Sequence, residues 1–379
     1  MRVYLDNAAT TPVDPKVVEA MIPVLTNTYG NPSSIHAKGR EAKALIERSR
    51  KSIAKYFNAS PAEFFFTSGG TEADNMIIRC AVHDLGVTRI ITSAIEHHAV
   101  LHTAEELSKI EGVQFVLVNL DEEGSVDLNH LKELLADESQ KTLVSLMHGN
   151  NEIANLLPLE TVGEMCKAHN ALFHSDTVQT MCHYRLDFKK LNVHFATCAA
   201  HKFHGPKGVG FMYVDSNFKF NPMITGGAQE RNVRAGTENI HGIVGLAKAI
   251  EIAHAEMEHH QEYVTDLKLY MVEQLKAIIP GVAFNGKSAT KDSLYTVLSV
   301  CFPPNDMGEM FLYNLDIEGI CASGGSACSS GSNVGSHVLR AIGAVMERPS
   351  IRFSFSRFST KEEIDHVVGV LKELYAVEA

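Results

Sequence analysis

Between residues 60 and 215, short runs rich in β-branched and aromatic residues alternate with segments of helical character. This alternation is typical of an α/β protein whose mostly parallel sheet is covered by helices. Strands are predicted at residues 63–66, 89–92, 142–147, 171–174 and 195–198, and a sixth at 209–214 leaves the loop after the fifth. We therefore expect an α/β fold built around these strands.

Polar groups of complementary chemistry follow the first five predicted strands. In chain order they are Gly69-Gly70-Thr71, His97, Asn150-Asn151, Asp176 and Lys202. Ligands of open α/β sheets bind beyond the carboxyl ends of the strands. One polar residue after a strand is ordinary because loops are polar, but five such groups on one rim indicate a binding site.

Charge and composition exclude several classes of partner. The 379 residues carry 34 Lys and Arg against 45 Asp and Glu, a formal net charge of −11 that repels nucleic acid and anionic lipid. Acidic Asp6 precedes any apolar stretch long enough for a signal peptide, and no later run approaches the length of a membrane span. We expect a cytoplasmic protein that binds neither nucleic acid nor membrane.

The seven cysteines are odd in number and widely spaced, which favours reduced thiols over a disulfide framework. Cys321 and Cys328 lack the Cys-x-x-Cys spacing of common zinc sites, and no second pair follows. No metal site is predicted. Cys328 lies in a Gly/Ser-rich stretch, about 323–336, with almost no apolar side chains, so we expect this loop to be mobile and its thiol reactive. A buried, inert cysteine is the alternative.

The chain is long enough for one large and one smaller domain. We expect residues 16–258 to form the large domain, and residues 1–15 and 259–379 to form a smaller α+β domain that carries the cysteine loop. Residues 245–278 read as long helices, and 294–302 and 350–354 as strands. A capping box, Thr360-x-x-Glu363, opens a final helix. One face of this helix carries Ile364, Val367, Val368, Leu371 and Leu374.

Two of the rim groups, together with nearby Gln179, suit the phosphate and ring of pyridoxal phosphate. The Gly69-Gly70-Thr71 turn before a helix offers backbone amides and a dipole end to a phosphate, although such a turn is also ordinary connection geometry. Asp176 suits a pyridinium nitrogen, although it equally suits the N-cap of a following helix. Gln179, three residues on, would share that helix face and donate to the phenolic oxygen of the ring.

Lys202 has the amine that a Schiff base with the cofactor requires, and neighbouring positive charge and burial would lower its pKa. His97 suits ring stacking and proton transfer because imidazole titrates near neutrality. Taken singly, Lys202 reads equally as a solvated surface charge and His97 as a loop histidine facing solvent.

Taken together, the motifs resemble the cysteine desulfurases of the iron-sulfur-cluster and nitrogen-fixation type, which are fold-type I pyridoxal phosphate enzymes. The resemblance covers nearly the whole chain. Its motifs are Tyr4-Leu5-Asp6-Asn7-Ala8-Ala9-Thr10-Thr11-Pro12, Gly30-Asn31-Pro32-Ser33-Ser34, Thr67-Ser68-Gly69-Gly70-Thr71-Glu72, Glu96-His97, His148-Gly149-Asn150-Asn151-Glu152, Asp176 with Gln179, His201-Lys202, Arg234-Ala235-Gly236-Thr237, the Cys328 segment and Ser350-Ile351-Arg352-Phe353-Ser354.

The resemblance implies a role for each matching residue. Lys202, Cys328 and His97 are the implied catalytic residues. The implied cofactor contacts are Gly70, Thr71, His97, Asn151, Asp176, Gln179, His201, Lys202 and Thr237, and the implied substrate contacts are Asn31, Asn151 and Arg352. Thr237 would reach the phosphate of the partner subunit, which implies a homodimer with pockets at its interface.

The implied reaction converts L-cysteine to L-alanine. The Cys328 thiolate takes the substrate sulfur as a persulfide and passes it to a protein acceptor such as an iron-sulfur scaffold. A selenocysteine lyase, an aminotransferase and a non-catalytic sulfur- or metal-carrying scaffold are the alternatives.

Two features depart from many relatives. Ala199 and Ala200 stand where many relatives have a serine before the lysine, so one phosphate contact is expected to be missing. The chain also ends soon after the final helix, which leaves the sulfur acceptor open.

Overall fold

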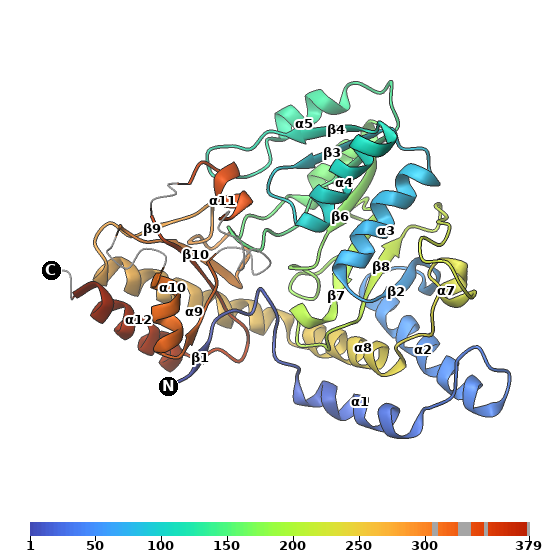
Figure 1. Cartoon of the computed structure of the whole chain (residues 1–379), viewed down its shortest axis with the longest axis horizontal. Helices are drawn as coiled ribbons and strands as arrows, with labels where there is room; N and C mark the ends of the chain where they lie inside the picture. The colour runs from blue at the N-terminus through green and yellow to red at the C-terminus, as the bar shows by residue number, and fades with distance from the viewer. Residues whose placement is uncertain (305–309, 325–334, 345–347, 377–379) are drawn as a thin grey trace.

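The computed structural model describes residues 1–304, 310–324, 335–344 and 348–376. A seven-stranded sheet with α2, α3, α4 and α8 beside it fills one side of the molecule, and α9, α10 and α12 gather with two small sheets on the other (Figure 1). No helix in the described part of the chain is long and apolar enough to cross a membrane.

The large sheet has the strand order β2-β8-β7-β6-β5-β3-β4. Its strands are β2 (Phe64–Thr67), β3 (Arg89–Ser93), β4 (Gln114–Val118), β5 (Thr142–Ser145), β6 (Leu172–Asp176), β7 (Phe195–Ala199) and β8 (Gly210–Val214). Only β8 runs antiparallel to its neighbours, so the other six strands point the same way. The carboxyl ends of β2, β3, β5, β6 and β7 therefore share one edge, as predicted.

Helices cover the large sheet and connect its strands. They are α1 (Pro15–Asn27), α2 (Ala37–Tyr56), α3 (Gly70–His83), α4 (His98–Glu111), α5 (Leu128–Leu135), α6 (Leu159–Ala168) and α8 (Ile240–Ala255), with short 3-10 turns η1 (Pro61–Glu63) and η2 (Ala200–Lys202). The segment α7 (Gln229–Asn232) is a left-handed turn, because Glu230 and Arg231 have φ of 45° and 57°. Every residue of β2, β3, β5, β6, β7 and β8 is buried, as expected of strands covered on both faces.

The second part of the molecule contains α9 (Met257–Ile278), α10 (Phe311–Ile317), α11 (His337–Ala341) and α12 (Lys361–Ala376). The antiparallel sheet β12-β10-β9 consists of Ser350–Ser354, Val297–Cys301 and Ala283–Phe284, and β1 (Val3–Tyr4) pairs in parallel with β11 (Ile320–Cys321). Apolar side chains of α9, α12 and these strands form a core separate from the clusters around the large sheet.

Most predicted elements are present, with shifted ends. The strand expected at 63–66 begins at Phe64, because the Ser60 and Glu63 side chains form a capping box that starts a 3-10 turn. The strand expected at 142–147 ends at Ser145, whereas that expected at 171–174 extends to Asp176. Strand β4 was not predicted, since it lies at the sheet edge with half-exposed residues.

The predicted final helix is confirmed together with its capping box. The Thr360 amide donates to Glu363 Oε2 at 2.9 Å, and the Glu363 amide donates to Thr360 Oγ1 at 3.2 Å. On the predicted face, Ile364, Val367 and Leu371 are fully buried in the second core.

Candidate active site

A cavity of about 280 Å³ opens at the carboxyl edge of the large sheet. Nine of the residues predicted to bind cofactor or substrate line it: Gly70, Thr71, His97, Asn151, Asp176, Gln179, His201, Lys202 and Arg352. Ala8 and Ala9 also line it, because the N-terminal segment crosses from β1 to the sheet edge, where the Thr11 amide donates to the His201 carbonyl at 2.9 Å. The cavity is therefore lined by residues from the N-terminal segment, from the edge of the large sheet and from the C-terminal part of the chain.

Lys202 ends the 3-10 turn that follows β7, and its side chain is directed into the cavity. Its Nζ donates to the carbonyl oxygens of Ala8 at 2.5 Å and Ala9 at 3.0 Å. The alternative of a solvated surface lysine is thereby excluded. A primary amine held by neutral carbonyl groups remains available for chemistry in the cavity.

Asp176 is the last residue of β6, and it is only 6% exposed. Its Oδ1 accepts from the Val178 amide at 2.9 Å, and burial together with neighbouring Asp74 raises its pKa. A buried carboxyl group of this kind is stabilised in its ionised form by a cation in the cavity, such as a protonated ring nitrogen.

The prediction of a helix after Asp176 is wrong. The chain continues through turns up to Tyr184, because the Thr180 and Met181 amides both donate to the Thr177 carbonyl and Cys182 has φ of 63°. Gln179 nevertheless reaches the cavity, where its Nε2 donates to the Ala8 carbonyl at 3.0 Å.

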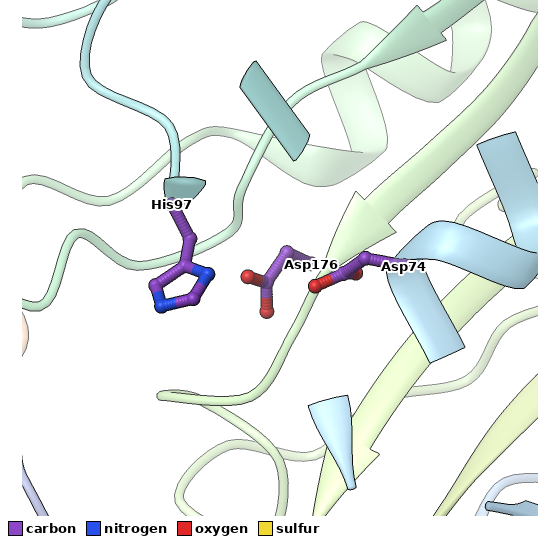
Figure 2. A group of neighbouring side chains, drawn as sticks. All are labelled: Asp74, His97 and Asp176. Carbon is purple, nitrogen blue, oxygen red and sulfur yellow. The ribbon is translucent and has the colours of Figure 1, made fainter. Parts of the chain in front are cut away.

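His97 is the N-cap of α4, and its Nδ1 accepts from the Ala99 amide at 3.1 Å. Nδ1 is therefore unprotonated in the neutral ring, and the proton sits on Nε2. Burial lowers the pKa of His97, so this neutral form prevails near neutral pH. Its ring faces the Asp176 carboxylate across the cavity, with Asp74 on the far side of Asp176 (Figure 2).

The part of the cavity around Gly70 suits a phosphate. Helix α3 starts there at Gly70, and no side chain of the described residues caps its first turn. A Cβ atom at Gly70 would lie 2.7 Å from Val178 Cγ2, so only glycine leaves room for this close approach. His201 lies beside the turn, with Nδ1 3.2 Å from Thr10 Oγ1. A helix N-terminus and neighbouring donor groups match a phosphate dianion.

Arg352, in β12, brings a guanidinium group to the cavity from the second part of the molecule. It is 2% exposed, its Nη2 donates to Asp6 Oδ1 at 2.9 Å, and its Nη1 donates to the Asn151 carbonyl at 3.0 Å. Its Nε is buried without a hydrogen-bond partner among the described residues. An arginine with an unused donor beside a cavity suits a carboxylate ligand.

Two predicted site residues in the described part of the chain, Asn31 and Thr237, do not line this cavity. Asn31 and Thr237 are exposed, and Asn31 Oδ1 accepts from the Ser33 amide at 2.9 Å. Thr237 follows Arg234, which pairs with Glu72 of α3 at 2.8 Å. Cys328 lies outside the described residues. The roles of all three stay predictions.

The structure adds cavity residues that the sequence analysis missed: Asp74, His98, Glu152 and His337. Asp74 had a visible signal, since it is an acid between apolar Ala73 and Met76 on the helix after the Gly-Gly-Thr turn. A carboxylate oxygen of Asp74, a ring nitrogen of His97 and a carboxylate oxygen of Asp176 all lie within 4.8 Å of one another.

The fold and the cavity are those of an enzyme with a polar site at the carboxyl edge of a parallel sheet. The chain belongs to the aminotransferase class-V family, which matches residues 3–367. This membership confirms the fold-type I architecture expected from the sequence.

The similar proteins are cysteine desulfurases and their relatives. "Cysteine desulfurase IscS" of Dictyoglomus turgidum is 43% identical over 376 residues, covering 98% of this chain and 94% of the relative. A solved structure titled "NIFS-LIKE PROTEIN" is 38% identical, covers all of both chains and has a TM-score of 0.91. A structure titled "SspA in complex with cysteine" is 29% identical, covers 95% of this chain and all of its own, and has a TM-score of 0.82.

Proposed function

We propose that this protein is a cysteine desulfurase that binds pyridoxal 5'-phosphate, converts L-cysteine to L-alanine and transfers the sulfur to Cys328 as a persulfide. One observation carries the proposal: Lys202, Asp176 and His97 meet in a cavity that is also lined by a helix N-terminus and a buried arginine. The desulfurase relatives support this choice among the reactions of the family.

The residues of the cavity fit the cofactor. Lys202 would hold it covalently, Asp176 would pair with its ring nitrogen, and Gly70, Thr71 and His201 would hold its phosphate. When bound, pyridoxal phosphate acts as an electron sink that stabilises negative charge at the substrate α-carbon. Buried Asp176 favours this chemistry because its carboxylate keeps the ring nitrogen protonated.

Arg352 and Asn151 would hold the substrate carboxylate. Asp6 and the Asn151 carbonyl orient the guanidinium group, so little side-chain entropy is lost when the substrate binds. The relative crystallised with cysteine supports an amino-acid substrate of this size.

Two groups would move protons. The Lys202 amine would take the substrate α-proton, and neutral His97, which carries a proton on Nε2, would give it to the substrate thiol. Because Nδ1 accepts from the Ala99 amide, the neutral His97 ring would act as a proton donor through Nε2.

Chain length supports the role of Cys328. On one side of its segment, Ser323 Oγ donates to Asp6 Oδ1 at 2.7 Å, and Asp6 also holds Arg352. On the other side, Ser336 Oγ donates to Glu152 Oε2 at 2.5 Å at the cavity wall. Because five residues span at most about 18 Å, a thiol at position 328 stays within reach of the cavity.

The test is to supply the purified holoenzyme with L-cysteine and a thiol reductant and to measure alanine and sulfide together. We expect equal yields. Cys328→Ala should keep the absorption band of the bound cofactor but lose sulfide release, whereas the control Cys321→Ala should retain both. Keto acid in place of alanine would indicate an aminotransferase, and turnover of selenocysteine alone would indicate a lyase. Undiminished sulfide release by Cys328→Ala would contradict the assigned role.

We also propose a homodimer in which Thr237 reaches the partner's phosphate site. An exposed apolar row on α1 supports a protein contact, because Val18, Ile22 and Leu25 follow a helical spacing and expose 42%, 51% and 58% of their surface. The molar mass in solution should be twice that of the chain. A monomer that binds the cofactor fully would contradict the proposal.

The persulfide on Cys328 would then pass to a protein acceptor such as an iron-sulfur scaffold. Transfer is measured with cysteine labelled at sulfur, by following the label onto the acceptor. Label that stays on this protein would argue against that acceptor.

A further inference from the structure

A second buried carboxyl group, Asp74, lies behind Asp176 and has no role in the mechanism above. It extends from α3 toward β6 and β7 and is 1% exposed. In Figure 2, Asp74 and His97 lie on opposite sides of Asp176; the Asp74 carboxyl group points toward Asp176, and the Asp176 carboxyl group points toward His97. An oxygen of Asp74 lies within 4.8 Å of one of Asp176.

A chain of hydrogen bonds from buried groups ends at Asp74. Thr197 Oγ1 donates to Asp74 Oδ1 at 2.7 Å, so this hydroxyl can only accept from His174, whose Nε2 is 3.1 Å away. Burial lowers the pKa of His174 to about 4, so its ring is neutral near neutral pH. With the ring proton on Nε2, Nδ1 accepts from Ser145 Oγ, 2.8 Å away. The groups in this chain of hydrogen bonds therefore bring no positive charge to Asp74.

Two carboxylates this close in a buried site repel each other strongly, so one of them keeps its proton. Asp176 is the better anion, because it accepts from the Val178 amide and faces both His97 and the open cavity. Within the described part of the chain, Asp74 accepts one hydrogen bond, from the Thr197 hydroxyl, with His174 Nε2 3.4 Å away, and burial raises its pKa to about 7.

Resting on the proposed function, we propose that Asp74 is a positioning residue that stays protonated while the neighbouring Asp176 is ionised. The pair then presents a single negative charge, on Asp176, to a single cationic ring nitrogen. Ionisation of Asp74 at higher pH would add a second negative charge behind the first. The ring nitrogen would then hold its proton more tightly, which ties the cofactor spectrum to the state of Asp74.

Other titratable groups surround the pair in the described part of the chain. His174 on β6 is neutral, Lys202 helps to lower the pKa of His97, and Glu96 precedes α4. Burial raises the pKa of Glu96 to about 8, so this residue also carries a proton at neutral pH. A test must therefore separate the signal of Asp74 from that of Glu96.

The test is an infrared difference spectrum of the protein between neutral pH and about pH 9, where a carboxyl group with a raised pKa ionises. In the wild type we expect the C=O stretching band of protonated carboxyl groups to decrease. Asp74→Asn is permanently neutral, so the part of this decrease due to Asp74 should be absent while that of Glu96 remains. An unchanged difference spectrum in Asp74→Asn would overturn the proposal.

The holoenzyme supplies a second readout. The visible band of the bound cofactor should change with pH in one step fewer in Asp74→Asn than in the wild type. Thr197→Val removes the hydrogen bond to the ionised form, so the Asp74 step should move upward by about 0.7 pH units, the equivalent of one ordinary hydrogen bond. General structural damage would not shift this step in a defined direction, and a downward shift or no shift would count against the proposal.

Failure of this inference can be told apart from failure of the proposed function. The infrared test also applies to the protein without cofactor, because the two carboxyl groups repel each other whether or not the cofactor is bound. If the wild type neither binds the cofactor nor releases alanine, the proposed function fails, whatever the infrared result. If it does both and Asp74→Asn titrates as the wild type does, only the role of Asp74 is lost.

Discussion

Replacement of Lys202 with alanine should lower the rate of alanine formation from cysteine by at least about a thousand-fold, because one residue supplies both the covalent attachment and the proton transfer. Its Nζ lies at the Ala8 and Ala9 carbonyls, in the cavity with Asp176 and His97. Pyridoxal phosphate should still bind through its phosphate and ring contacts, but borohydride reduction should leave none attached to the chain. Mass spectrometry of the reduced protein measures this directly.

Lys219→Ala is the matched control, since this lysine is exposed beyond β8 and far along the chain from the cavity loops. It should keep the attached cofactor and normal turnover. Retention of a reducible cofactor linkage in Lys202→Ala would place the attachment elsewhere and remove the basis of the assignment.

Replacement of Glu230 with alanine should lower the free energy of unfolding by about 3–5 kcal/mol, because it leaves a buried guanidinium group with only the exposed Glu47 as counter-ion. Arg50 and Glu230 form two parallel hydrogen bonds of 2.8 Å, and their side chains are 2% and 3% exposed. Glu230 also accepts from the Phe66 amide at 2.8 Å, which ties the left-handed turn at 230–232 to β2. Denaturant unfolding of the protein without cofactor measures the loss.

The exposed pair Lys248 and Glu251 supplies the control, because it has the same charges at 2.7 Å in solvent. Glu251→Ala should barely change the unfolding midpoint. The double variant Arg50→Met with Glu230→Met should recover much of the loss, since no buried charge remains. Equal midpoints for Glu230→Ala and Glu251→Ala would show that the buried pair contributes no more to stability than the exposed pair.

Much of the catalytic rim could be predicted because strand ends are local features. Lys202 and Asp176 each stand at the end of a short apolar run, and parallel strands bring such ends to one edge of the sheet. Alternation of strands and helices and the capping box at Thr360 were sufficient for the fold class and the last helix.

Other features could not be predicted from neighbouring residues in the sequence. The N-cap interpretation of Asp176 assumed a helix, but residues after it turn back toward the N-terminal segment, where Gln179 donates to Ala8. Asp74 was missed because its partners Thr197 and His174 lie about 100 or more residues away in the chain. Contacts between distant segments leave no periodic signal.

The sequence by itself determined the order of strands and helices, the amine at position 202 and the rim on which it stands, since each depends on a few neighbouring residues. Only the tertiary structure decided that residues 8 and 9 hold that amine, that Arg352 from the second core enters the same cavity, and that a second carboxyl group lies behind Asp176. The physical reason is that burial sets the charge of these groups, and burial exists only after distant parts of the chain have packed together.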